Sequence, residues 1–177
     1  MGGGEFRLGR GEMDLYRFRT PIGEMTAALD GSGALKELSF RGRETVAGAP
    51  VRETRAGAEV ERQLVEYFAG RRTEFALALD PDGTPFQKEV WKALLGIPYG
   101  QRRSYSEIAR RVGKPDAVRA VGAANGANPI AIVIPCHRVV GKDGSLTGYG
   151  GGLPVKRYLL DLESGQPRLP GIAPRRR

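Results

Sequence analysis

Cys136 and His137 are adjacent, and they are the only cysteine and the only histidine in the chain of 177 residues. A thiol attacks an electrophile as the thiolate, and with an ordinary pKa of about 8.5 it is mostly protonated at neutral pH. Cys136 therefore needs a base or a cation nearby, and His137 is the only imidazole available. The pair predicts a cysteine nucleophile. The alternative is a small buried hydrophobic residue beside a structural histidine.

The scarcity of these residue types excludes several kinds of site. One cysteine cannot form an intramolecular disulfide, and one cysteine with one histidine cannot supply the ligands of a usual structural zinc site. We therefore expect no metal and no cofactor. A lone thiol suits a reducing compartment. No apolar run approaches the roughly 20 residues that span a bilayer, and the N-terminus lacks the apolar core of a signal peptide. We expect a cytoplasmic protein without a membrane partner.

Positive charge is concentrated in the half that contains Cys136. The net charge is +8: residues 13–83 hold ten Lys and Arg against twelve Asp and Glu, whereas residues 84–165 hold twelve against six, and residues 166–177 add four arginines. Such a distribution is expected of a surface that meets a polyanion such as nucleic acid. The alternative is a basic protein whose charge serves only solubility.

The elements before the turn Asp80-Pro81-Asp82-Gly83 predict a small N-terminal α/β domain over residues 13–82, after a flexible leader over residues 1–12. Alternating apolar residues separated by turns predict antiparallel strands over 15–19, 25–29 and 35–40. Helical periodicity predicts a helix over 56–69, and a further strand is expected over 75–79. We find no catalytic constellation in this half.

The second half, residues 83–165, predicts a mainly helical domain, so the fold class is α+β. Thr84-Pro85-Phe86-Gln87 and Ser104-Tyr105-Ser106-Glu107 are helix starts of the capping-box kind. The first opens a helix that ends at Gly96 and buries Trp91. The second opens a short helix, and a third helix follows over 117–124. Two short helices joined by a glycine-containing turn predict a helix-turn-helix. A last helix is expected over 154–163, before a disordered basic tail over 166–177.

The run from Thr84 to Glu163 resembles the C-terminal domain of the methylated-DNA–protein-cysteine methyltransferases, the 6-O-alkylguanine-DNA alkyltransferases. The segments that carry this resemblance, in order, are Thr84-Pro85-Phe86-Gln87, Val90-Trp91, Ile97-Pro98-Tyr99-Gly100, Ser104-Tyr105, Arg119-Ala120-Val121-Gly122, Asn128-Pro129, Pro135-Cys136-His137-Arg138-Val139, Gly148-Tyr149-Gly150-Gly151 and Leu159-Leu160 with Glu163. The resemblance implies a small α/β domain before the catalytic one.

The resemblance also implies the chemistry. Cys136 is the acceptor whose thiolate displaces guanine from the alkyl carbon, once and irreversibly. His137 acts as the base through a water, because adjacent side chains of an extended chain point to opposite faces. Glu163 orients the imidazole. Tyr105 protonates or hydrogen-bonds the departing purine. Asn128 ties the helix pair to the active-site turn.

A methyl group on a guanine oxygen is not openly reachable inside a duplex, so the nucleotide must leave the stack. Arg119 matches the family's intercalating arginine, on a helix that approaches the minor groove. The residues expected at the DNA are Ser104, Tyr105, Arg110, Lys114, Arg119, Ala120 and Arg138. The residues expected around the guanine are Val139, Tyr149, Gly150 and Asn125.

Together these observations predict a monomer that repairs double-stranded DNA by moving the alkyl group of O6-alkylguanine, and of O4-alkylthymine, to Cys136. A second hypothesis is a binding module that recognises alkylated bases and recruits other repair factors, with Cys136 incidental. A third is a cysteine hydrolase. Alkyltransferase-like proteins replace the acceptor cysteine, and the presence of Cys136 argues against that class.

Overall fold

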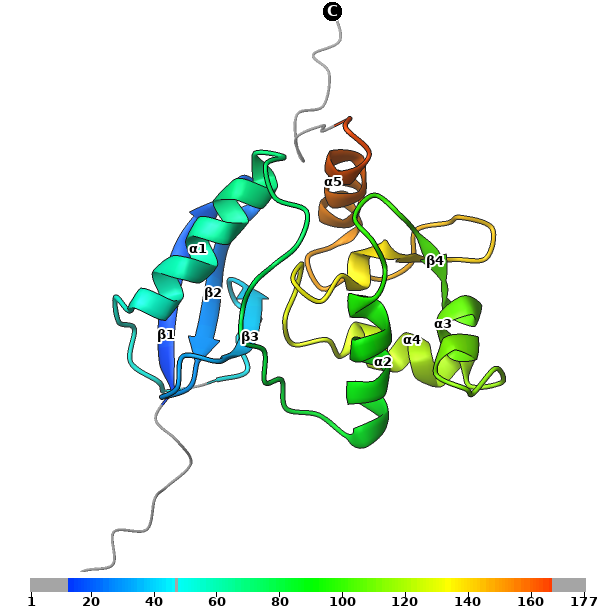
Figure 1. Cartoon of the computed structure of the whole chain (residues 1–177), viewed down its shortest axis with the longest axis horizontal. Helices are drawn as coiled ribbons and strands as arrows, with labels where there is room; N and C mark the ends of the chain where they lie inside the picture. The colour runs from blue at the N-terminus through cyan, green and yellow to red at the C-terminus, as the bar shows by residue number, and fades with distance from the viewer. Residues whose placement is uncertain (1–12, 47, 167–177) are drawn as a thin grey trace, which may run out of the picture.

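A three-stranded sheet covered by one helix lies beside a group of short helices in the computed structural model, which describes residues 13–46 and 48–166 (Figure 1). The elements in chain order are β1 (Asp14–Thr20), β2 (Gly23–Leu29), β3 (Leu35–Phe40), α1 (Arg55–Phe68), α2 (Pro85–Leu95), β4 (Arg103–Ser104), α3 (Tyr105–Arg111), α4 (Val118–Gly126), the 3-10 helix η1 (Cys136–Arg138), β5 (Val139–Val140) and α5 (Leu153–Glu163). The predicted α+β fold is confirmed. The predicted leader, and the predicted tail except for Gln166, lie outside the described residues.

The sheet is an antiparallel meander in the order β1-β2-β3, as the turn pattern predicts. Helix α1 lies along one face of it (Figure 1). The edge of β3 continues into the other half of the chain. Leu38 N–H donates to Pro129 O, and Ala131 N–H donates to Leu38 O. This pairing fixes the segment that leads to Cys136 against the sheet.

The prediction of a strand over residues 75–79 is wrong. The chain there makes one bridge, in which Leu35 N–H donates to Ala78 O and Asp80 N–H donates to Leu35 O. The reason is competition for one edge, because β3 is paired with Pro129 and Ala131 from Leu38 onward. A two-residue parallel pair, β4 with β5, was not predicted, since two residues give no periodic signal.

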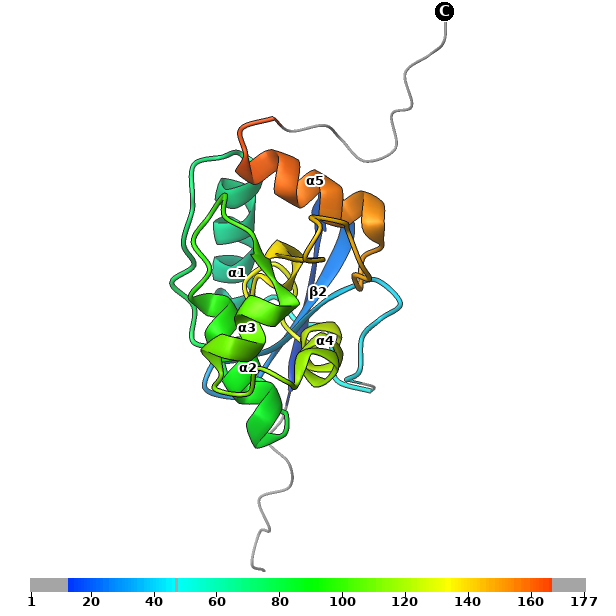
Figure 2. The same cartoon turned by 90° about the vertical axis from the view of Figure 1, so that its right-hand side faces the viewer.

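The helical half packs around Trp91, and its prediction as a core residue is confirmed. Trp91 is 2% exposed and its indole N–H donates to Ala124 O at 2.8 Å, which joins α2 to α4. Both capping boxes are present, at Thr84 and at Ser104. Helices α3 and α4 pack on each other as a helix pair. Figure 2 shows α5 lying across the top of the molecule, beside the end of α1, where the rings of Phe68 and Tyr158 stack. No helix within the described ranges is long and apolar enough to cross a membrane.

We expect Gly57→Ala to destabilise the protein by about 1–3 kcal/mol. Gly57 lies inside α1, where alanine is normally the better residue by about 1 kcal/mol. A methyl group at this position, however, would lie only 2.3 Å from Cγ of the Tyr16 ring. Gly126→Ala in α4 is the matched control, because no atom lies within 4 Å of its added methyl group. Denaturant unfolding that ranks the two variants equally would contradict this packing.

Candidate active site

The turn that carries Cys136 is built by Asn128. Its side-chain amide donates to Ile130 O and to Ile134 O at 3.3 and 2.9 Å, and its carbonyl oxygen accepts from Ile130 N–H at 3.0 Å. These bonds close the loop between the end of α4 and η1. Cys136 and His137 then lie in a 3-10 turn rather than in the extended chain that we expected. The reason given for their separation is therefore wrong.

The Glu163 carboxylate, at the end of α5, is the centre of the buried polar network. Its Oε1 lies 2.7 Å from His137 Nε2 and accepts from Tyr67 Oη at 2.7 Å and from Arg138 Nη2 at 3.0 Å. Its Oε2 accepts from Arg138 Nε at 2.8 Å and from Gly100 N–H at 3.2 Å. Five donors thus meet one carboxylate, which lies where a group that orients His137 must lie.

The partners of His137 determine which nitrogen can act as the base. A carboxylate oxygen only accepts, so Nε2 carries the proton toward Glu163. Nδ1 is buried and has no hydrogen-bond partner within the described residues. Burial lowers the pKa of His137, although the hydrogen bond and the charge of Glu163 act the other way. The imidazole is therefore neutral at neutral pH, with Nδ1 free to take a proton.

The pKa of Glu163 is shifted in the direction that keeps it ionised. Burial alone would raise it, but the hydrogen bonds from His137 and Arg138 and the positive charge of Arg138 outweigh burial and lower the pKa to about 2. The Arg138 guanidinium supplies this positive charge at both oxygens of Glu163.

Cys136 is a thiol at rest. It is buried, and burial raises its pKa, while the side chain of Asn128 and the charge of Lys156 act to lower it. Lys156 was not identified from the sequence. It is fully buried, and its Nζ donates to Val139 O at 2.6 Å and to Thr147 O at 3.0 Å. Its position on the buried face of α5, three residues before Leu159, was the available signal.

A cavity of about 600 Å³ opens on Cys136 and is lined by both halves of the chain. The predicted pocket residues Asn125, Tyr149 and Gly150 line it. Val139 does not, because it is fully buried and its carbonyl is bonded to Lys156.

Within residues 13–46 and 48–166, three polar atoms of side chains that line this cavity have no hydrogen-bond partner: Ser39 Oγ, Asn125 Oδ1 and Tyr149 Oη. Buried polar groups usually have partners, so this set suits a ligand with several hydrogen-bonding atoms. Phe40, at the end of β3, packs edge-on against Tyr149 with ring centroids 5.9 Å apart. Neither Ser39 nor Phe40 was identified from the sequence, because both come from the N-terminal half.

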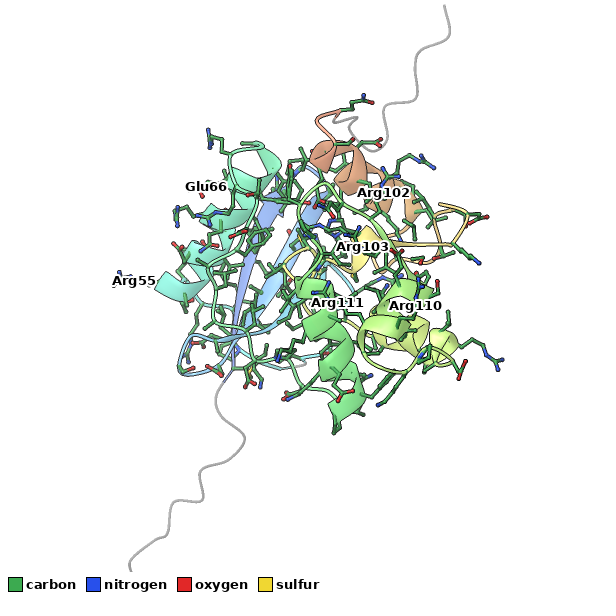
Figure 3. All side chains as sticks on the ribbon, turned by 45° about the vertical axis from the view of Figure 1, so that its right-hand side comes forward. Arg55, Glu66, Arg102, Arg103, Arg110 and Arg111 are labelled. Carbon is green, nitrogen blue, oxygen red and sulfur yellow. The ribbon has the colours of Figure 1, made fainter. Side chains whose placement is uncertain are left out.

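The residues predicted to meet DNA are mostly on the surface of α3 and α4. Arg110, Lys114, Arg119 and Ala120 are exposed. Figure 3 shows Arg110 and Arg111 on the helical half, with Arg102 and Arg103 on the segment that precedes α3. Ser104 caps α3. Tyr105 is half-buried and shares a hydrogen bond with Thr147 Oγ1 at 2.7 Å.

Arg138 does not fit its predicted role at the DNA. It is 6% exposed, and its guanidinium is bonded to both oxygens of Glu163 and to Ile97 O. A DNA phosphate could bind the Arg138 guanidinium only if Arg138 gave up its hydrogen bonds to Glu163. Its role is to hold the carboxylate beside His137.

Comparisons with known proteins agree with this arrangement. Residues 85–165 match the family model described as 6-O-methylguanine DNA methyltransferase, DNA binding domain. The methylated-DNA–protein-cysteine methyltransferase of Methanosarcina barkeri is 50% identical over 152 residues, which cover 84% of this chain and 96% of the relative. That of Mycobacterium tuberculosis is 64% identical over 104 residues, 59% of this chain and 63% of the relative. A crystal structure of Mycobacterium tuberculosis OGT in complex with DNA superposes with a TM-score of 0.81 at 48% identity, covering 87% of this chain and 94% of that one.

The carboxylate network predicts a defined loss of stability in acid. The pKa of Glu163 is lowered from 4.5 to about 2, so its contribution is complete above pH about 4.5 and is lost as pH falls toward 2. That contribution is roughly 3 kcal/mol. Glu163→Gln should therefore show a shallower fall in unfolding free energy between pH 5 and pH 2 than the parent. Parallel pH dependences in denaturant unfolding would contradict the network.

Proposed function

This chain belongs to the methylated-DNA–protein-cysteine methyltransferase family, and from that premise we propose that it repairs DNA by moving an alkyl group from O6 of guanine to Cys136. The same reaction is proposed for O4-alkylthymine. In the transfer the Cys136 sulfur–carbon bond forms while the carbon–oxygen bond to the base breaks. The sulfur ends as a thioether, so each molecule reacts once.

The proton of Cys136 has a defined route in this proposal. The thiol gives it, through a water, to His137 Nδ1, and Glu163 stabilises the imidazolium that forms. The base leaves with the electron pair of the broken carbon–oxygen bond and takes up one proton from water while hydrogen-bonded to Tyr105. The His137 imidazolium returns the thiol proton to water, so the reaction neither gains nor loses a proton overall. The proposal rests on the His137 imidazole, whose Nε2 lies 2.7 Å from Glu163 Oε1, in the residue directly after a thiol that lines the cavity.

We propose that double-stranded DNA approaches α4 through the minor groove and that the alkylated nucleotide flips into the cavity. Arg119, exposed at the start of α4, fills the space left in the stack. The protein acts as a monomer in the cytoplasm, with residues 13–82 and 83–165 as its two domains.

The burial of Cys136 favours the alternative of a binding module without transfer. Burial raises the pKa of Cys136, and a buried protonated thiol is a poor nucleophile unless a base removes its proton. Only alkyl transfer leaves a covalently bound alkyl group on Cys136.

Intact mass after incubation with a duplex containing O6-methylguanine separates them. We expect one added methyl group per chain and none in Cys136→Ser, which should still bind the methylated duplex about as tightly as the parent. An alcohol has a far higher pKa than a thiol and does not replace it as nucleophile. A parent protein that binds the methylated duplex and gains no mass would support the module.

Arg119→Ala should slow the reaction with duplex DNA and leave the reaction with a free alkylated base nearly unchanged. The unstacking of the nucleotide, which costs a few kcal/mol, loses its compensation when nothing fills the gap. Arg110→Ala, on exposed α3, is the control that removes one cation without removing the intercalating residue. Rates on both substrates are compared at fixed salt. Equal losses of Arg119→Ala on duplex and on free base would rule out intercalation.

A further inference from the structure

Tyr67 brings the N-terminal half of the chain into contact with the active site. It lies on α1, 96 residues before Glu163 in the sequence, and its hydroxyl donates to Glu163 Oε1 at 2.7 Å. The side chain is fully buried. Its ring is held by Phe68, Phe75 and Tyr99, with centroids 5.4, 5.4 and 6.0 Å away. The ring cannot swing away without opening this aromatic cluster.

The oxygen that Tyr67 contacts is the one that faces His137. Oε1 lies 2.7 Å from His137 Nε2, so the phenol and the imidazole share it. Burial and the charge of Glu163 raise the pKa of Tyr67 well above 10. The phenol therefore keeps its proton at neutral pH and donates to Glu163.

We infer that Tyr67 is a positioning residue for the alkyl transfer, one that fixes Glu163 Oε1 against His137 and takes a share of its negative charge. This inference rests on the proposed function. A carboxylate oxygen with another donor stabilises an imidazolium less, because part of its charge is already satisfied. The phenol thus keeps His137 less basic than Glu163 alone would make it.

Other titratable groups face the same pair. Arg138 contacts Glu163 from η1, and Lys156 lies on α5; both cations lower the pKa of His137. Tyr149, in the loop before α5, has its ring centroid 6.4 Å from that of His137. Cys136 directly precedes His137 in the chain. The Arg138 guanidinium lies over the Tyr99 ring. Among the groups named here, Tyr67 alone comes from the N-terminal half.

Tyr67→Phe removes one oxygen and keeps the ring. We expect the acid limb of the rate–pH profile, measured at saturating alkylated duplex, to move to higher pH by about one unit. The neutral imidazole is the reactive form, and a more basic His137 is more often protonated at a given low pH. The rate on that limb should fall about tenfold, whereas the rate on the plateau above it should stay near that of the parent.

Tyr16→Phe is the matched control. Tyr16 Oη also donates to a glutamate of α1, Glu61 at 2.6 Å, within the N-terminal half. If Tyr67 served only stability, both variants would unfold more easily and neither would shift the limb. An acid limb of Tyr67→Phe that coincides with those of Tyr16→Phe and the parent would overturn the inference.

A second readout does not depend on catalysis. His137 is the only histidine, so its imidazole signals in NMR are assigned without ambiguity. They should titrate at higher pH in Tyr67→Phe than in Tyr16→Phe, and an identical titration would overturn the inference. A parent that gains no methyl group from alkylated DNA would instead refute the proposed function, and the titration would still test the contact.

Discussion

The structure depends on an ionised carboxylate buried between the two halves of the chain. Removing such a charge from water costs several kcal/mol unless its oxygens are fully hydrogen-bonded. The donors to Glu163 come from α1, from the turn before β4 and from η1, while the carboxylate itself ends α5. No single element supplies enough of them. The hydrogen bond from Tyr67 therefore ties α1 of the N-terminal half to the carboxylate that ends α5, beside the shared core and the pairing of Leu38 with Pro129 and Ala131.

The same buried environment determines the protonation states of Glu163, His137 and Cys136. Glu163 stays ionised because Arg138 is bonded to both its oxygens, His137 is neutral because burial disfavours a further cation, and Cys136 keeps its proton for want of solvation. A resting thiol is protected from chance electrophiles. We propose that the nucleophile forms only when a substrate is in place and the proton moves to Nδ1, in a site whose hydrogen bonds already fit the charged imidazole.

Local signals in the sequence predicted what local interactions decide. The capping boxes at Thr84 and Ser104 and the meander of β1 to β3 needed only neighbouring residues, and they were predicted within a few residues. Features set by distant partners were missed. Residues 75–79 do not form a strand, because Pro129 and Ala131 pair with the edge of β3. Arg138 is buried because its guanidinium is bonded to the buried carboxylate of Glu163. Tyr67 looked like an ordinary core residue of an amphipathic helix. Ile132 is buried and has a positive φ of 70°. Branched residues rarely adopt this backbone conformation, so the residue type gives no signal for it.

The proposed chemistry requires that Glu163 hold His137 as the neutral tautomer, with its proton on Nε2 and a free Nδ1. Nitrogen-15 NMR of the single imidazole, in the unreacted protein at neutral pH, measures this directly. We predict one protonated nitrogen, coupled to a hydrogen that exchanges slowly and is strongly hydrogen-bonded, and one unprotonated nitrogen. In Glu163→Gln the hydrogen on Nε2 should exchange faster and be less strongly hydrogen-bonded, because a neutral amide oxygen replaces the carboxylate. An imidazolium with two protonated nitrogens, or the tautomer with its proton on Nδ1, would contradict this role of Glu163.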